Sequence, residues 1–218
     1  MFKEGQLKSL GIATGLIILN VAVMWIFGFT PLSMLNQLLF GTFLFLGVVV
    51  YGALLTGGSW LAKKGIREDN TNKAVAGTTV VEVAYGMFGA GIITTLLDPG
   101  LQLIALGITG IVTTGIAILA GLLVFGTGHD FSSWGSYANY IFLGVLGVSF
   151  IGSFSGIFAL ISFGLALLGF IVLLVYQIYQ TKKRPGKPFL NGIGLYIAYM
   201  GVFVEILQIV VRMLARRK

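Results

Sequence analysis

Residues 101–125 read LQLIALGITGIVTTGIAILAGLLVF, and they decide the fold because no side chain in this run carries a charge. A helix needs about 20 consecutive apolar residues to cross the hydrocarbon core of a bilayer. The run is uniformly apolar and lacks the short alternating pattern of an outer-membrane barrel strand. It therefore predicts a transmembrane helix.

The composition extends this prediction to the whole chain. Hydrophobic residues make up 57% of the 218 positions and charged residues 10%, whereas about 25% of the residues of a soluble domain are charged. The mean hydropathy is +0.98. We predict an all-α integral membrane protein with one domain, residues 1–218, folded as a seven-transmembrane-helix bundle. The predicted spans are residues 10–29, 35–56, 74–97, 101–125, 134–151, 156–179 and 191–214. In one alternative, the fifth and sixth spans form a single broken helix with a re-entrant turn at residues 152–155.

The net charge of +7 reflects membrane orientation rather than nucleic-acid binding. Ten basic residues fall on one side of the seven-span arrangement, and the loops between them on the other side contain no Lys or Arg. By the positive-inside rule, the basic side and the N-terminus are cytoplasmic. The ten residues are Lys3, Lys8, Lys63, Lys64, Arg67, Lys73, Lys182, Lys183, Arg184 and Lys187.

The basic C-terminus conflicts with this arrangement. Arg212, Arg216, Arg217 and Lys218 would lie outside, because the number of spans is odd. Either the seventh segment crosses the membrane and its basic end is tolerated, or it is re-entrant and the tail returns to the cytoplasm.

Glycine is frequent, with 32 residues, many of them inside the spans. Small residues four positions apart let membrane helices approach closely. The spacings Gly11 to Gly15 and Gly152 to Gly156 predict two such packing faces.

Two carboxyl groups, Glu82 and Glu205, lie inside apolar spans. A charge at membrane depth costs a few kcal/mol or more, so such a residue normally faces the bundle interior and finds a partner. In a helix, Glu205 shares a small and polar stripe with Gln208 and Arg212, which predicts that the last helix packs centrally. Arg212 is about 10 Å along the axis from Glu205, so Gln208 could bridge the two. The stripe consists of Gly194, Ala198, Gly201, Glu205, Gln208 and Arg212.

The third span carries a similar stripe, formed by Thr78, Glu82, Gly86 and Gly89. The functional hypothesis is a polar core that responds to protons or cations. The alternatives are a structural hydrogen-bond network or, for Glu82, solvation near the cytoplasmic end.

The only histidine, His129, precedes Asp130 and Ser132 in the loop GTGHDFSSWG. Asp130 or Ser132 can cap the fifth helix, so the loop is interpreted first as a helix boundary. His129 could also sense pH, because its reference pKa is near neutrality.

No residue set suggests an enzyme. His129 lies at the cytoplasmic end of the fourth span, whereas Ser153 and Ser155 lie near the opposite face, about a bilayer away. No span contains aspartate, which excludes an intramembrane aspartyl protease, or lysine, which excludes a retinal Schiff base. Cysteine is absent, so no thiolate metal site is expected. We expect neither a catalytic residue nor a bound metal or other cofactor.

Three segments resemble the Bax inhibitor-1 family, also called the transmembrane Bax-inhibitor-motif family. Residues 129–135, HDFSSWG, look like its Lys-Asp-(Phe/Met/Leu)-Ser-x-Leu-Gly segment. Residues 85–92, YGMFGAGI, are similar to its Phe-x-Phe-x-x-x-Gly-(Ile/Leu) run, and residues 194–203, GLYIAYMGVF, to its Ser-Leu-Tyr-x-x-x-x-Asn-(Ile/Leu)-Phe run. Each motif alone has low specificity. Together with the seven spans, the three motifs follow the family's order over nearly the whole chain.

The resemblance implies a seventh helix surrounded by six others and a pH-sensitive calcium or other cation leak. Leak-type members of the family carry a pair of aspartates where this chain has Gln177, or a neighbouring residue, and Ala198, so Glu205 would supply a displaced charge. The alternative that the resemblance implies is a regulator of a membrane-anchored AAA protease in stress protection. We expect the lipid bilayer and such a protease as partners, calcium only as a transported ion, and a prokaryotic inner membrane as the location.

Overall fold

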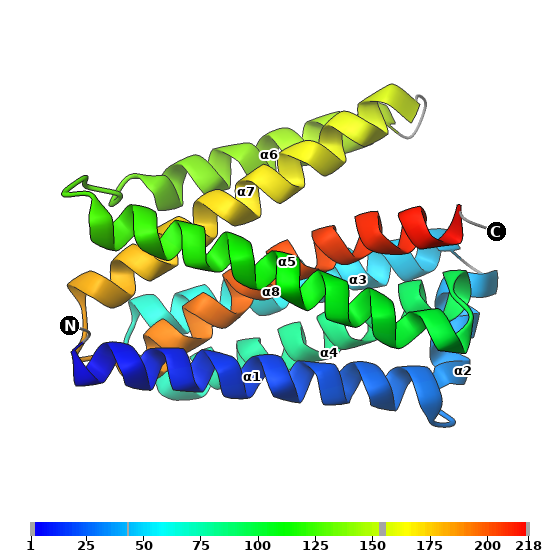
Figure 1. Cartoon of the computed structure of the whole chain (residues 1–218), viewed down its shortest axis with the longest axis horizontal. Coiled ribbons are helices and arrows are strands. Elements are labelled where there is room, and N and C mark those ends of the chain that lie inside the picture. Colours follow the sequence, from blue (N-terminus) through cyan, green and yellow to red (C-terminus); the bar gives the residue numbers. More distant parts are fainter. Residues whose placement is uncertain (1–2, 43, 153–155, 217–218) are drawn as a thin grey trace.

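The computed structural model describes residues 3–42, 44–152 and 156–216, and it is helical throughout, with no β-strand in these ranges. Seven long helices account for nearly all of it, and a short helix and a π-helical turn follow the first of them (Figure 1). In chain order the elements are α1 (Glu4–Phe29), α2 (Ser33–Asn36), η1 (Gln37–Thr42), α3 (Leu44–Arg67), α4 (Thr71–Leu96), α5 (Pro99–Gly126), α6 (Trp134–Gly152), α7 (Gly156–Lys183) and α8 (Pro188–Ala215).

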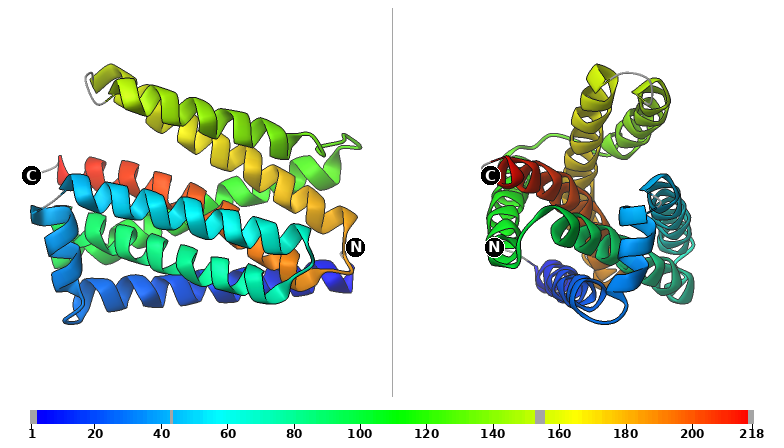
Figure 2. Two further views of the ribbon diagram at one scale, coloured as in Figure 1. Left: turned by 180° about the vertical axis from the view of Figure 1, so that it is seen from behind. Right: turned by 90° about the vertical axis from the view of Figure 1, so that its right-hand side faces the viewer.

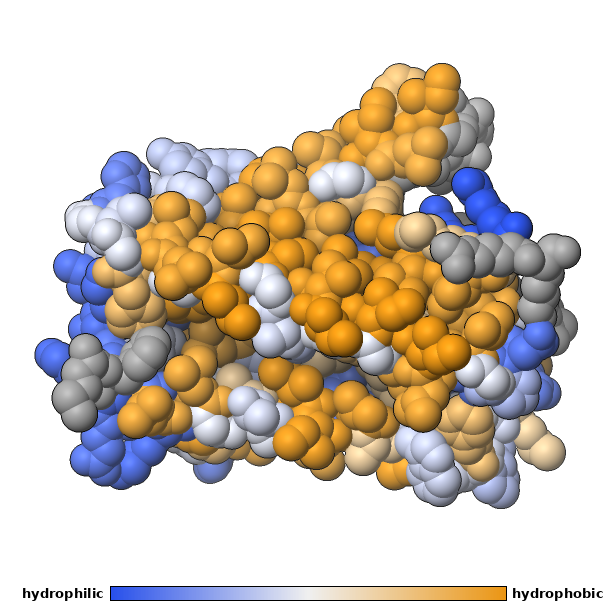
Figure 3. Space-filling model, in the orientation of Figure 1, coloured by the Kyte–Doolittle hydropathy of each residue, from blue (hydrophilic) through white to orange (hydrophobic). Residues whose placement is uncertain are grey.

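Five of the seven long helices are long and apolar enough to cross a membrane, namely α1, α4, α5, α7 and α8. Figure 3 shows the corresponding surface, with an apolar middle and hydrophilic residues gathered at both ends. The prediction of an all-helical membrane protein is thereby confirmed. The predicted count of seven spans is not, since α3 and α6 do not belong to this set within the part of the chain that the structure describes.

The last helix runs the full length of the bundle. α8 is continuous from Pro188 to Ala215, and the two termini of the chain lie at opposite ends (Figure 1). The alternative of a re-entrant final segment is therefore wrong. Arg212 lies at the end opposite Lys182 and Lys183, which close the last turn of α7.

α6 and α7 form an antiparallel hairpin rather than one broken helix. The two helices lie side by side in both views of Figure 2, and the hydroxyls of Ser149 and Ser162 are hydrogen-bonded across them. Residues 153–155, where a re-entrant turn was an alternative, lie outside the described residues. The C-terminal end of α6 and the N-terminal end of α7 lean away from the other helices (Figures 1 and 2), and α6 packs chiefly on α7.

The predicted central position of the last helix agrees with its burial. α8 packs against α1, α3, α4, α5 and α7, and Tyr196, Met200 and Leu207 on it are completely buried. Within the described residues it thus packs closely against five long helices, one fewer than the resemblance implies, because α6 packs chiefly against α7.

Close packing occurs at other glycines than those predicted. A Cβ atom added to Gly77 on α4 would lie 2.6 Å from the main-chain oxygen of Gly58 on α3, so these two helices touch backbone to backbone. Nothing lies within 4 Å of a Cβ atom at Gly11 or Gly15 on α1, and the predicted contact there is wrong. The second predicted face includes Gly156, whose surroundings are not described.

Candidate functional site

The centre of the bundle holds a polar cluster, which we define as Asn20 on α1, Glu82 on α4 and Tyr196 on α8. Nδ2 of Asn20 lies 2.7 Å from Oε2 of Glu82, 3.0 Å from the Glu82 main-chain oxygen and 3.0 Å from the Tyr196 hydroxyl. An amide nitrogen carries two hydrogens, so the three acceptors share its two donors. The cluster joins three helices through one side chain.

The cluster is deeply buried. Asn20 and Tyr196 are 0% exposed and Glu82 is 5% exposed. Glu82 is the twelfth residue of α4, about 16 Å along the helix from its start, and its side chain lies inside the bundle. The alternative that Glu82 is solvated at the cytoplasmic end is therefore wrong.

Two oxygen atoms of the polar cluster are buried without a hydrogen-bond partner, Oε1 of Glu82 and Oδ1 of Asn20. An unsatisfied buried polar atom costs about 1–3 kcal/mol, and more when it is charged. A protonated carboxyl group gains one O–H donor and loses its charge. Glu82 can thus accept a proton, and protonation changes both the charge of the polar cluster and its number of hydrogen-bond donors.

The local sequence explains why Glu82 meets Asn20. The predicted stripe of α4 faces α1, and a Cβ atom on Gly86 or Gly89 would collide with Val23 or Met24 of α1. Because these glycines have no side chain, α1 approaches α4 closely. Glu82, one turn before Gly86 on the same face, then reaches Asn20.

Tyrosines lie near both carboxyl groups. The Tyr85 hydroxyl on α4 donates a 3.3 Å hydrogen bond to the main-chain oxygen of Ile197 on α8, the residue after Tyr196. Tyr85 and Tyr51 lie close enough to Glu205 to interact with it electrostatically.

Glu205 is partly buried, and its Oε2 accepts a 3.1 Å hydrogen bond from Nε2 of Gln208. Arg212 lies over the ring of Phe163, 5.7 Å from its centroid, and within the described chain it forms no ion pair with Glu205. Gln208 thus contacts Glu205 as predicted but does not bridge it to Arg212.

The predicted stripe of α8 faces α7. A Cβ atom on Gly194 would lie 2.9 Å from Cδ of Gln177, and one on Gly201 would overlap Phe170. Gln177 therefore packs against the stripe, but about 16 Å along the axis separates Gly194 from Glu205 on α8. The structure does not bring Gln177 together with Glu82 or Glu205.

The loop with His129 forms a helix boundary, as predicted: α5 ends at Gly126 and α6 begins at Trp134. Asp130 accepts hydrogen bonds from the Tyr179 hydroxyl at 2.6 Å and from the Ser132 N–H at 2.9 Å. These bonds, with the tyrosine contributing most, lower the pKa of Asp130 to about 2. Asp130 therefore stabilises the turn before α6 and ties it to α7, but its bond to Ser132 lies two residues ahead of the first residue of α6 and is not a cap of that helix. His129 is exposed, with its ring edge-on to Phe131.

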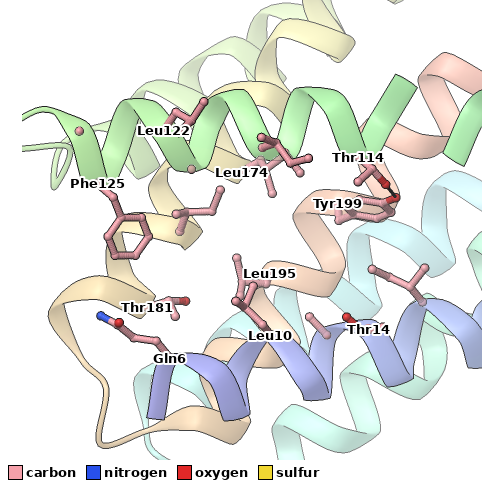
Figure 4. A pocket seen from close by; sticks show the side chains of 17 residues that line it. Gln6, Leu10, Thr14, Thr114, Leu122, Phe125, Leu174, Thr181, Leu195 and Tyr199 are labelled. Carbon is pink, nitrogen blue, oxygen red and sulfur yellow. Dashed lines mark hydrogen bonds between the residues drawn. The ribbon is translucent and has the colours of Figure 1, made fainter. Parts of the chain in front are cut away.

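A separate cavity of about 810 Å³ lies between α1, α5, α7 and α8 (Figure 4). Its walls are mostly apolar, and they include none of Glu82, Glu205 or Gln177. In this conformation the carboxyl groups and the cavity are distinct features. Within the described residues, no three His, Asp or Glu side chains come together as a possible metal site.

Two residues of the polar cluster, Asn20 and Tyr196, are absent from the sequence-based set of candidates. The signal for Asn20 was a single amide in the apolar run LIILNVAVMW. Tyr196 carried no such signal, because a tyrosine in a membrane helix is ordinary. No protein-family model, curated protein or solved structure matches this chain.

Proposed function

We propose that this protein is a pH-sensitive cation leak, with calcium as the transported ion, which opens when Glu82 loses its proton. The observation that carries the proposal is the buried cluster of Asn20, Glu82 and Tyr196. A carboxylate at this depth is costly unless it is neutralised or hydrated. The protonation state of Glu82 therefore changes how stably α1, α4 and α8 pack together.

The direction of the pH effect follows from the contacts. The side chains that face Glu82 are Asn20 and Tyr196, and neither carries a positive charge. When Glu82 is ionised, no cation of the described chain compensates it, so water or a permeating cation must do so. Oxygen atoms are the ligands that calcium prefers, and Glu82 and Asn20 each hold one without a partner. We expect the flux to increase with pH.

Calcium flux into liposomes that contain the purified protein, measured from pH 5 to pH 8, tests this proposal. Glu82→Gln should abolish the pH dependence, and Glu205→Gln should weaken it. Glu4→Gln is the matched control, because it makes the same change at an exposed carboxylate that is paired only with Lys8. Absence of flux at every pH would refute the leak, and an unchanged pH profile for Glu82→Gln would remove that residue from the mechanism.

A second candidate function is regulation of a membrane-anchored AAA protease during stress. The α6–α7 hairpin favours it, since the adjoining ends of α6 and α7 stand away from the bundle and both helices expose large apolar side chains. Leu143, Leu146, Ile157 and Leu160 are each more than 60% exposed. Leu146→Trp should reduce co-purification of such a protease, whereas Leu103→Trp on α5, where the side chain is 78% exposed, should not.

We also propose that α3 and α6 cross the membrane, which gives seven spans, and that the basic end with the N-terminus faces the cytoplasm of a prokaryotic cell. The chain has no cysteine, so single cysteines can be introduced as labelling sites. Lys183→Cys should react with an impermeant thiol reagent from the cytoplasmic side and Arg216→Cys from the other side. Labelling of both residues from one side would contradict the topology.

A further inference from the structure

The cavity between α1 and α5 is a groove that opens towards lipid. Its floor consists of residues of α7 and α8, among them Leu174 and Leu195 (Figure 4). Leu122 and Ile118 lie at its α5 edge and are 64% and 58% exposed. α1 and α5 thus face each other across the groove without close packing.

One end of the groove is polar and positively charged. Gln6 and Thr181 line it there, and Lys182 follows directly in the sequence (Figure 4). Nζ of Lys182 donates a 2.7 Å hydrogen bond to the main-chain oxygen of Val124 and lies 5.4 Å from the centroid of Phe125, which also lines the groove. An ammonium group has three donors. Within the described chain, Lys182 forms no ion pair.

The dimensions of the groove suit an extended amphiphilic ligand. From Thr114 to Gly126 on α5 it extends about 18 Å, about three fifths of a hydrocarbon core of about 30 Å. The cavity has a volume of about 810 Å³, within the usual range for a small ligand, and its walls are mostly apolar.

We propose that this groove binds an acyl chain of an anionic membrane phospholipid, whose phosphate contacts Lys182 and the Gln6 amide. The acyl chain would extend from the basic end of the groove towards Thr114 and Tyr199. The hydroxyls of these two residues are hydrogen-bonded to each other at 3.0 Å and so need no polar partner from the lipid. An acyl chain gains little by leaving bulk lipid, which is equally apolar. The selectivity therefore resides in the charge at the mouth of the groove.

Two pairs of variants separate the acyl site from the headgroup site. Gly121 lines the groove and nothing lies within 4 Å of a Cβ atom there, so the side chain of Gly121→Leu enters the groove without a clash at its Cβ atom. Gly107→Leu is its control, because Gly107 is equally open on the same helix but lies outside the groove. Lys182→Gln removes the charge at the mouth, and Lys183→Gln removes the neighbouring charge, which lies over Tyr179.

The test is native mass spectrometry of protein released from nanodiscs of equal parts phosphatidylglycerol and phosphatidylcholine. The wild type and both controls should retain one phosphatidylglycerol. Gly121→Leu should reduce its retention about tenfold, the equivalent of about 1.4 kcal/mol. Lys182→Gln should retain the two lipids equally. A wild type that shows no preference for phosphatidylglycerol, or unchanged retention in Gly121→Leu, would overturn the proposal. Thermal unfolding of each variant in detergent verifies that it is folded.

Discussion

The amide of Asn20 on α1 donates a 2.7 Å hydrogen bond to the carboxyl group of Glu82 on α4, in the middle of a helical membrane bundle. Removal of this donor leaves Glu82 with fewer partners. We expect Asn20→Leu to lower the free energy of unfolding by about 1–3 kcal/mol, the usual cost of an orphaned buried polar group. Thermal unfolding in detergent measures the change. Asn139→Leu, at an exposed amide on α6, is the control, and equal stability of both variants would contradict a structural role for the bond.

The contact between α3 and α4 predicts that Gly77 tolerates no side chain. In Gly77→Ala the new methyl group would lie 2.6 Å from the Gly58 oxygen and 2.8 Å from Cα of Ala62, both on a rigid backbone. Overpacking of this kind costs about 1–3 kcal/mol. Gly107→Ala, with nothing within 4 Å, should be neutral or slightly stabilising. Chemical unfolding in mixed micelles compares the two, and a neutral Gly77→Ala would show that the helices are farther apart.

Asp130 should titrate far below an ordinary aspartate. Its pKa is about 2, lowered from 3.8 mainly by the Tyr179 hydroxyl. Because the pKa of Asp130 is lower in the folded state, its ionised carboxylate stabilises the folded protein. This stabilisation is complete above about pH 4 and disappears as the pH falls towards 2. Carboxyl NMR of the protein in micelles should show this titration. Tyr179→Phe should raise the pKa of Asp130, and Tyr176→Phe, one turn earlier, should leave it unchanged.

The ion pair between Lys187 and Asp69 joins the loop before α8 to the loop before α4, but it should contribute little to stability. Both side chains are about half exposed. Exposed ion pairs typically contribute about 0.2–1 kcal/mol, and salt screens them. We expect Lys187→Gln to unfold within about 0.5 kcal/mol of the wild type. A larger loss that persists in high salt would indicate that the loop contact matters through packing.

The helical membrane class and the centrality of the last helix were predictable from the sequence. Long uncharged runs permit only helices in lipid, and a small and polar stripe must avoid lipid, so both inferences rest on strong energetic penalties. The packing glycines were not predictable in the same way. Gly11 and Gly15, four positions apart, have no close neighbour, whereas Gly86 and Gly89, three positions apart, pack against α1, because which glycine face meets a partner depends on the tertiary arrangement.

The candidate site was predictable only in part. Glu82 and Glu205 were evident, because a carboxyl group in an apolar run is rare. Their partners were not, because the distance in sequence from Asn20 to Tyr196 is 176 residues and no local pattern relates them. Arg212 was expected near Glu205 on the basis of helical periodicity, but its long side chain instead reaches Phe163 on the neighbouring helix.

The central position of α8 also sets the order of assembly during synthesis. Asn20 leaves the ribosome 176 residues before Tyr196, an interval of about 9 to 35 s at 5–20 residues per second. α4 ends at Leu96, so for the last 100 residues of this interval, about 5 to 20 s, α1 and α4 are inserted without α8, which packs against both. Until α8 is made, the nascent chain therefore exposes the polar side chains of Asn20 and Glu82 within the membrane. Chaperones or proteases that bind unfinished membrane proteins have that time to recognise them.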